Sequence, residues 1–312
     1  MLDILAQTNG ITLTPYIGWI VGFLLLIVFS ALIIYETKNP KIKSPKKQLI
    51  QSYKTNIGMF VVNTILMSVL SASVLVLIID PEPLGLLDYI PNTGMRIILS
   101  FLLLDLLLYC WHRLCHIYDW LWMFHRVHHN DPCLNVTTAF RVHIVELIIT
   151  TILKTILIIY AGIDEMIYVV NEFITTAFVM FHHTNIKVKG ESKLERVFIS
   201  PSLHRTHHSV LRTEHDSNYG AVFSIWDQLF GTLIKAEPVA VGINGESPLN
   251  LIDLIQFGFE KSPQPKPVIE GVSVPLNEMI AVAAYYKAEK RGFYPGDDQR
   301  DWYDAQREFV DL

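Results

Sequence analysis

The fold of this chain is decided by an apolar stretch near its start, Ile17-Gly-Trp-Ile-Val-Gly-Phe-Leu-Leu-Leu-Ile-Val-Phe-Ser-Ala-Leu-Ile-Ile-Tyr35, which contains no charged residue. A bilayer core of about 30 Å needs roughly 20 apolar residues as a helix, so this stretch predicts a membrane span. A signal peptide is the alternative, but the apolar run is long and neither a basic n-region nor an A-x-A site is present. A second uncharged stretch, Thr55–Ile79, predicts a second span.

The composition of the whole chain agrees with a membrane protein. Of its 312 residues 51% are hydrophobic and 18% are charged, whereas soluble domains carry about a quarter charged residues. The net charge of −5 argues against a nucleic-acid-binding protein. The three cysteines, Cys110, Cys115 and Cys133, are an odd number and form no C-x-x-C pair, which argues against a disulfide framework and favours a reducing compartment.

Charges in the loops predict the orientation of the spans. Lysine dominates the loop after the first span, and acidic residues dominate the loop after the second. Excess lysine and arginine mark the cytoplasmic side, so the first loop is predicted inside and the second outside. The lysine-rich loop contains Lys38, Lys41, Lys43, Lys46, Lys47 and Lys54 against Glu36, and the acidic loop contains Asp80, Glu82 and Asp88 before Arg96.

With this orientation, the histidines fall at one membrane surface. The third apolar segment, Ile97–Trp111, runs inward and delivers His112 to the cytoplasmic boundary. The segments Ile144–Gly162 and Met166–Phe181 predict a hairpin that leaves this surface and returns to it. We therefore predict an all-α membrane helix bundle with about four spanning or half-spanning helices and a cytoplasmic, helical, histidine-rich cap.

Each arm of the predicted hairpin contains one charge, Lys154 or Glu172, at the same distance from Ile163 in the turn. An unpaired charge inside a membrane is costly, so one hypothesis is that the two side chains form an ion pair within the bundle. In the alternative, Lys154 extends to the interface and Glu172 lines a hydrated cavity.

Changes in composition divide the chain into four parts. Segment 236–276 includes a proline-rich linker, and the last segment is predicted to form two short helices, Glu278–Arg291 and Asp297–Phe309. The predicted parts are an N-terminal transmembrane hairpin with its loops at 1–94, a catalytic domain at 95–235, an extension and linker at 236–276, and a small helical segment at 277–312.

All twelve histidines lie between His112 and His215. His112 and His116 are four residues apart, and two further clusters have the spacing i, i+3, i+4, so each set lies close to one face of a helix. Imidazole is a common ligand of transition metals, and a zinc site takes only three or four protein ligands. Eight histidines at ligand spacing therefore predict a binuclear metal centre. The two further clusters are His125, His128 and His129, and His204, His207 and His208.

The order of these motifs resembles the fatty acid hydroxylase / sterol desaturase superfamily of membrane enzymes. The resemblance runs from about Met95 to Thr232. It rests on Asp105-x-x-x-Tyr109-x-x-His112-Arg-x-x-His116, His125-Arg-Val-His128-His129, Arg141-Val-His143-x-x-Glu146, His183-Thr-Asn185, Pro201-Ser-Leu-His204-Arg-Thr-His207-His208, Asn218-Tyr-Gly220 and Trp226-Asp227-x-x-Phe230-Gly231-Thr232. A shorter resemblance joins the C-terminal segment to a small uncharacterised bacterial helical domain.

The resemblance implies an oxidoreductase that binds two iron ions, uses O2 and hydroxylates or desaturates a lipid C–H bond. It implies that zinc can replace iron on purification and that a separate ferredoxin- or cytochrome-type donor with an NAD(P)H reductase supplies electrons. The shorter C-terminal resemblance favours a bacterial origin, so the predicted location is a bacterial inner membrane, and the loop charges place the site on the cytoplasmic face. The implied metal ligands are His112, His116, His125, His128, His129, His183, His204, His207 and His208; His143, His182 and His215 stay open between ligand and neighbour.

Other polar residues are candidates for supporting roles. Asp105, Tyr109 and Asn185 are predicted to act around the ligands or on the substrate side. Wider candidates for orienting the histidines are Asp119, Asp131, Glu146, Asp216, Asn218 and Asp227, because metal-bound histidines usually donate their second N–H to an oxygen. Contact with lipid phosphates is predicted for Arg113, Arg126, Arg141, Arg205 and Arg212.

Two other functions remain as alternatives from the sequence. A zinc-dependent membrane hydrolase that cleaves a lipid amide or ester would need only three or four histidines. A metal carrier or a haem-binding membrane protein would place histidine pairs across the spans rather than at one surface. The sequence does not choose between hydroxylation and desaturation, and a sterol, carotenoid, fatty acyl chain, alkylglycerol or aminolipid could each be the substrate.

Overall fold

The computed structural model describes residues 14–74, 85–243 and 248–260, together with 280–281, 283–285, 287–288 and 296–310 near the C-terminus. The described residues up to 260 form one compact unit, and those from 280 onward belong to a second. In the second unit, helix α14 (Asp298–Val310) contributes Ala305 to a small apolar core with Ile280 and Ala284. The helix predicted at 297–309 is therefore present, and much of the one predicted at 278–291 lies outside the described residues.

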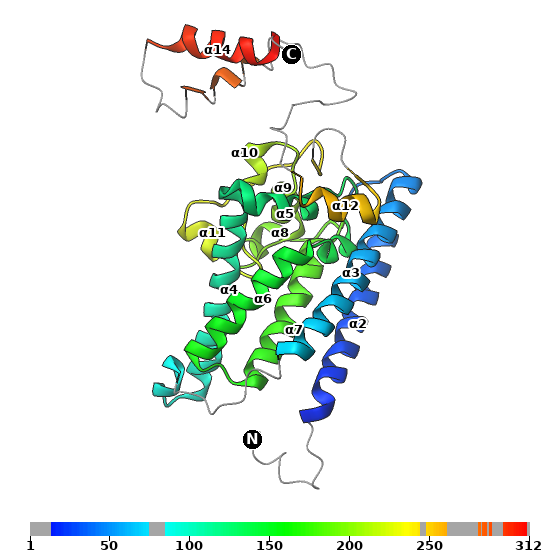
Figure 1. The fold of residues 1–312 in the computed structure, drawn as a ribbon, viewed down its shortest axis with the longest axis vertical. Helices are drawn as coiled ribbons and strands as arrows, with labels where there is room; N and C mark the ends of the chain where they lie inside the picture. The colour runs from blue at the N-terminus through cyan, green and yellow to red at the C-terminus, as the bar shows by residue number, and fades with distance from the viewer. Residues whose placement is uncertain are drawn as a thin grey trace. The chain divides into compact units, whose positions relative to one another are not determined.

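The first unit is built around five long helices that run along its length (Figure 1). The described residues contain no strand, so the predicted all-α bundle is confirmed. Segments Tyr16–Lys38, Thr93–Ile117 and Ile144–Ala161 are long and apolar enough to cross a membrane. The five helices are α2 (Thr14–Lys38), α3 (Lys46–Val74), α4 (Thr93–Ile117), α6 (Ile144–Ala161) and α7 (Glu165–His182).

Two of the predicted spans correspond to helices that are not among these three segments. Helix α3 begins nine residues before the predicted second span, at Lys46, and residues 75–79 of that span lie outside the described part of the chain. Its first turns carry exposed lysines together with the buried Ser52, Thr55 and Asn56, whose partners are described below. Helix α7 forms the returning arm of the predicted hairpin and carries Glu165 and Glu172.

The turn of the hairpin and the charges on its arms fit together as a unit. Helix α6 ends at Gly162, whose φ of 68° is in the left-handed region that glycine adopts most easily. Asp164 begins α7 by accepting hydrogen bonds from the N–H groups of Met166 and Ile167. Lys154 Nζ lies 2.8 Å from Glu172 Oε1, so the predicted ion pair between the arms is present.

Short helices form a cap at one end of the bundle (Figure 1). Helix α12 (Leu251–Phe257) packs on α3 and on α5 (Asp119–His129). The core between these helices includes Met59, Val127, Leu254 and Phe257. The 3-10 helix η2 (Leu86–Tyr89) packs against the hairpin turn at the other end. The elements of the cap are α5 (Asp119–His129), the 3-10 helix η3 (Val136–Phe140), α8 (Glu191–Leu194), α9 (Pro201–His207), α10 (Arg212–His215), α11 (Ile225–Leu229) and α12 (Leu251–Phe257).

Candidate metal centre

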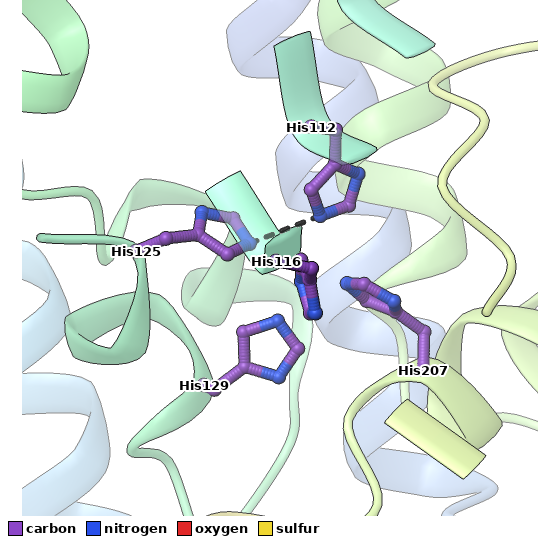
Figure 2. Close-up of side chains that lie close together, drawn as sticks. All are labelled: His112, His116, His125, His129 and His207. Atoms are coloured by element: carbon purple, nitrogen blue, oxygen red, sulfur yellow. Dashed lines mark hydrogen bonds between the residues drawn. The ribbon is translucent and has the colours of Figure 1, made fainter. Parts of the chain in front are cut away.

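Nine histidines gather in the cap as two neighbouring groups. Within each group, the nitrogen atoms that can bind a metal all lie within 4.8 Å of one another. The rings of His129 and His208, one from each group, stack with centroids 4.5 Å apart, so the groups are adjacent. The five-histidine group consists of His112, His116, His125, His129 and His207 (Figure 2), and the four-histidine group consists of His128, His183, His204 and His208. These are the nine residues that the resemblance implies as ligands.

Helix geometry explains how each histidine cluster is divided between the groups. Successive residues of an α-helix are about 100° apart, so residues i and i+4 lie only about 40° apart, while residue i+3 lies about 100° from residue i+4 towards the other edge of the same face. On α5, His125 and His129 join the five-histidine group and His128 joins the other. In the cluster that begins on α9 the pattern is reversed, because His204 and His208 stay together while His207 crosses over. Each cluster thus gives its i+3 member to the opposite group.

In the five-histidine group, the outer nitrogens of four rings contact oxygen atoms. Two of these oxygens belong to carboxylates and two to backbone carbonyls. The Nδ1 contacts are His112 to Tyr219 O at 2.9 Å, His116 to Asp216 Oδ1 at 3.1 Å, His125 to Glu146 Oε1 at 2.8 Å and His207 to Ser217 O at 2.6 Å. Glu146 and Asp216, two of the wider set of predicted orienting residues, therefore touch histidines directly.

In the four-histidine group, the outer contacts are to backbone carbonyls alone. His128 Nδ1 lies 3.3 Å from Arg141 O, and His183 Nδ1 lies 2.6 Å from Val179 O. The Nδ1 atoms of His204 and His208 are buried and have no hydrogen-bond partner among the described residues. A carbonyl oxygen can only accept, so Nδ1 carries the proton in His128 and His183, and Nε2 presents a lone pair.

The inward-facing nitrogens fit metal ions. The Nε2 atoms of His128 and His183 are 3.1 Å apart, and those of His112 and His125 are 3.0 Å apart. Burial lowers the pKa of His128 well below its ordinary value, so its ring is neutral at pH 7. Lone pairs that face each other at such distances repel unless a cation binds both. The donor set of neutral imidazoles therefore suits iron, zinc, copper or nickel ions.

Aromatic side chains enclose the five-histidine group. Tyr219 is 4% exposed, and its ring packs against His112 and His116 with centroids 5.6 and 5.1 Å away. Trp122 lies over His116 and His129, at 4.9 and 5.1 Å. Such packing excludes water and holds the rings in fixed orientations.

The three histidines left open by the sequence lie outside both groups. At the N-cap of α6, His143 Nδ1 accepts a hydrogen bond from Val145 N, and its Nε2 lies 3.2 Å from Ile255 O. His182 packs with its ring centroid 4.0 Å from that of His204. His215 belongs to a third set with His116 and Asp216, and its Nδ1 lies 3.1 Å from Ser209 O. Of the three, His215 is the one that belongs to a set of at least three possible ligand atoms that lie within 4.8 Å of one another.

Asp105 and Tyr109 support a loop rather than a histidine. The carboxylate of Asp105 accepts hydrogen bonds from the backbone of Val222 and Phe223 and from Trp226 Nε1. The Tyr109 hydroxyl lies 2.9 Å from Thr232 Oγ1, and its ring stacks on Phe230. Asp227, which accepts from the N–H groups of Tyr219 and Gly220, fixes the same loop. This loop includes Tyr219, whose carbonyl contacts His112.

Asn185 also has a structural partner instead of a histidine. Its side chain accepts from Ile42 N and donates to Ile42 O, which fastens the loop after α2 to the segment that follows His183. The buried carboxylate of Glu36 completes this junction by accepting from the N–H groups of Asn185 and Val136. Sequence reasoning missed Glu36. Its one signal was that it is the single acidic residue in a lysine-rich stretch.

The predicted contact of arginines with lipid phosphates is wrong for three of them. Arg126, Arg141 and Arg205 are each at most 2% exposed, and their guanidinium groups donate to carbonyl oxygens inside the protein. A buried guanidinium cannot reach a headgroup. Arg212 is exposed and forms an ion pair with Asp216.

Comparison with known proteins gives two family matches. Residues 97–232 match the family described as fatty acid hydroxylase, and residues 275–309 match a protein family of unknown function, DUF2934. The first match spans every histidine of both groups. It also contains Glu146 and Asp216.

Curated relatives include an ornithine lipid hydroxylase from Rhizobium tropici, 30% identical over 48% of this chain and 46% of the relative. Alkylglycerol monooxygenases from Homo sapiens and Caenorhabditis elegans are each 30% identical, over 51% and 62% of this chain and 35% and 38% of the relatives. The chain therefore spans less than half the length of these relatives. No solved structure matches the chain significantly.

Proposed function

Because residues 97–232 match the fatty acid hydroxylase family, we propose that the chain is a membrane-bound lipid hydroxylase of the fatty acid hydroxylase / sterol desaturase superfamily with two iron ions. The observation that carries this proposal is the pair of adjacent all-histidine groups at one end of an apolar helix bundle. The nine histidines of the two groups would be the iron ligands. Asp105, Tyr109 and Asn185 would act as supports of the surrounding loops.

The proposed reaction consumes O2, two electrons and two protons for each C–H bond that becomes C–OH, and it releases one water molecule. Iron, when bound, supplies the redox chemistry that an unactivated C–H bond requires and that no side chain can provide. The same site would form an alkene if two hydrogens were removed from adjacent carbons, so desaturation remains within the proposal. Electrons would come from a separate ferredoxin- or cytochrome-type protein with an NAD(P)H reductase.

The chain's own residues would hold and shield the site. Glu146 and Asp216 fix the tautomers of His125 and His116 and make these rings stronger donors. Tyr219 and Trp122 exclude water, which protects an oxidising site from side reactions. The bundle would present a lipid to the cap from the membrane side, and the lysine excess next to α2 favours a cytoplasmic cap.

The relatives narrow the proposed substrate. One is named for hydroxylation of ornithine lipid and others for oxidation of alkylglycerols. We therefore propose a polar membrane lipid with an aminolipid or glycerol headgroup as the substrate class.

Metal content and lipid products together test this function. The full chain, produced under iron-replete and low-zinc conditions, is expected to contain two irons per chain. Cells that produce it should accumulate a polar lipid heavier by one oxygen atom, labelled when isotopic O2 is supplied, and cells that produce His128→Ala should not. One zinc per chain with lipid cleavage instead of oxidation would contradict the proposal and favour the zinc-dependent hydrolase.

A further inference from the structure

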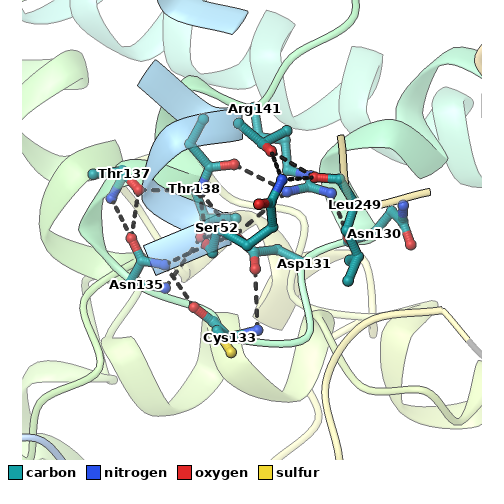
Figure 3. Close-up of polar contacts among 12 residues, drawn as sticks. Ser52, Asn130, Asp131, Cys133, Asn135, Thr137, Thr138, Arg141 and Leu249 are labelled. Atoms are coloured by element: carbon teal, nitrogen blue, oxygen red, sulfur yellow. Dashed lines mark hydrogen bonds and ion pairs between the residues drawn. The ribbon is translucent and has the colours of Figure 1, made fainter. Parts of the chain in front are cut away.

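A fully buried polar cluster lies beside the end of α5, outside both histidine groups (Figure 3). Its central residue, Asp131, is completely buried, and one of its oxygens, Oδ2, accepts hydrogen bonds from Ser52, Asn56 and Thr138 at 2.7–2.9 Å. Burying charged groups costs several kcal/mol per ion before compensation, so a cluster of this kind needs a structural or functional reason. The polar cluster consists of Ser52, Asn56, Asp131, Asn135, Thr137, Thr138 and Arg141, each at most 5% exposed.

Arg141 connects the polar cluster to the end of α5. Its Nε donates to Val127 O at 3.1 Å, and its Nη2 donates to Asn130 O at 2.6 Å. The last carbonyls of a helix have no partner within it, and a cation is stabilising there. His128 and His129, one from each histidine group, occupy the last two positions of this helix. The guanidinium of Arg141 therefore fixes the backbone on both sides of these two residues.

Arg141 also contacts the ring of His128. Its carbonyl oxygen lies 3.3 Å from His128 Nδ1. A shift of Arg141 would thus move both the backbone that carries His128 and the oxygen that selects its tautomer. In the five-histidine group, by contrast, Arg141 contacts none of the rings, and the four outer ring contacts come from four separate residues.

Asn56 ties the polar cluster to α3. Its Oδ1 accepts from Arg141 Nη1 at 3.1 Å, and its Nδ2 donates to Asp131 at 2.9 Å and to Thr137 at 3.0 Å. The amide thereby contacts the guanidinium and the carboxylate together and holds them in one arrangement. Helix α3 lies before residue 97, where the match to the fatty acid hydroxylase family begins.

We propose that Asn56, Asp131 and Arg141 are positioning residues for His128, so that α3 sets the metal affinity of the four-histidine group. The inference rests on the proposed metal-binding role of that group. It assigns a function to a helix outside the family-matched segment, where the N-terminal hairpin would otherwise serve only as a membrane anchor.

Cobalt(II) titration of the full chain, stripped of metal by a chelator, tests this inference without any enzymatic turnover. The wild type is expected to bind two cobalt ions that absorb in the visible range. In Asn56→Leu, the ion of the four-histidine group should bind about 10- to 100-fold more weakly with an altered spectrum, because His128 loses the support of both its backbone and its ring. The other ion should be weakened less, because only the backbone of His129 is affected. The matched control is Thr55→Val, since Thr55 is also buried on α3 but donates to Leu249 O outside the polar cluster.

A second variant separates positioning from charge balance. Arg141→Lys keeps a positive charge for Asp131 but lacks the planar fork that reaches three acceptors. It should bind cobalt as weakly as Asn56→Leu does. If Arg141→Lys does not fold, Asn56→Leu alone carries the test.

Several results would overturn the inference. One is an Asn56→Leu protein that melts at a lower temperature but binds both cobalt ions as the wild type does, since the polar cluster would then be only structural. Full cobalt binding by Arg141→Lys, or an equal loss in Thr55→Val, would overturn it as well. A wild-type chain that binds no cobalt would instead overturn the metal centre itself, and the inference with it.

Discussion

The two histidine groups both draw ligands from α5 and from the cluster that begins on α9, but they are supported by different chemistry. In the five-histidine group, carboxylates contact His116 and His125. In the four-histidine group, the outer contacts within the described residues are carbonyls, and two rings have an unpartnered Nδ1. A carboxylate raises the basicity of a metal-bound imidazole, so the five-histidine group should hold its ion more tightly. Equal ligand spacing in the sequence can therefore produce two sites of unequal affinity.

The largest expected effect comes from removing one ligand from each group in turn. His204 and His207 lie three residues apart in the same cluster and belong to different groups. His204→Ala and His207→Ala should each reduce the metal content from two ions per chain to one, and each should abolish lipid oxidation, because a lost ligand opens the coordination of one ion. Elemental analysis and lipid mass spectrometry measure these outcomes. Loss of both ions in either variant would mean that the groups are not separate sites.

Removing a carboxylate that contacts a histidine should weaken metal binding in the five-histidine group alone. Glu146→Gln keeps a hydrogen-bond acceptor for His125 but loses the charge, and metal affinity in the five-histidine group should fall about 10- to 100-fold. Asp216→Asn should act in the same direction through His116. Competition with a chelator of known affinity measures the metal dissociation constant of each variant.

The matched control for these two variants is Glu195→Gln, a buried carboxylate that contacts Ser200 and Lys235 instead of a histidine. It should leave both affinities unchanged. Equal weakening of the two groups by Glu146→Gln would remove the proposed difference between them.

His143, which lies outside both groups, should affect stability but not metal binding. His143→Ala removes the N-cap of α6 and should lower the free energy of unfolding by about 1 kcal/mol. Metal content should stay at two ions per chain. Denaturation in detergent and elemental analysis measure the two quantities, and a loss of metal would place His143 in the centre after all.

The smallest effect should come from Arg212, the exposed partner of the carboxylate that contacts His116. Arg212, whose side chain is 64% exposed, pairs with Asp216 at 3.0 Å. Solvent screens such pairs, so Arg212→Ala should change stability by less than about 0.5 kcal/mol and leave metal affinity unchanged. A clear fall in affinity would show that this ion pair, and not the carboxylate by itself, supports His116.

Much of the fold followed from local properties of the sequence. The long apolar stretches predicted α2, α4 and α6 because span length and a low density of charge depend on neighbouring residues alone. The equal distance of Lys154 and Glu172 from the hairpin turn suggested an ion pair as one of two hypotheses, and the structure contains that ion pair. Helix α3 fitted less well, because its first turns carry buried Ser52, Thr55 and Asn56, whose partners lie far along the chain.

The supports of the metal centre were harder to predict. Asp105 and Asn185 were placed near the ligands by sequence proximity, yet their short side chains bind loop backbone. Three arginines near a membrane surface suggested phosphate contacts, but they are buried against carbonyl groups. A polar residue close to a ligand in sequence can face in any direction, and only packing decides which one.

The sequence by itself determined which residues could bind metal, because helical spacing brings His125 with His129 and His204 with His208. Helical spacing also places His128 and His207 at the other edge of the same helix face, about 100° from the next histidine. Only the tertiary structure decided that these two cross into opposite groups, because that depends on how α5 and α9 approach each other. It also decided the partners at Nδ1, since Glu146, Asp216 and Arg141 reach the rings through contacts between distant parts of the chain.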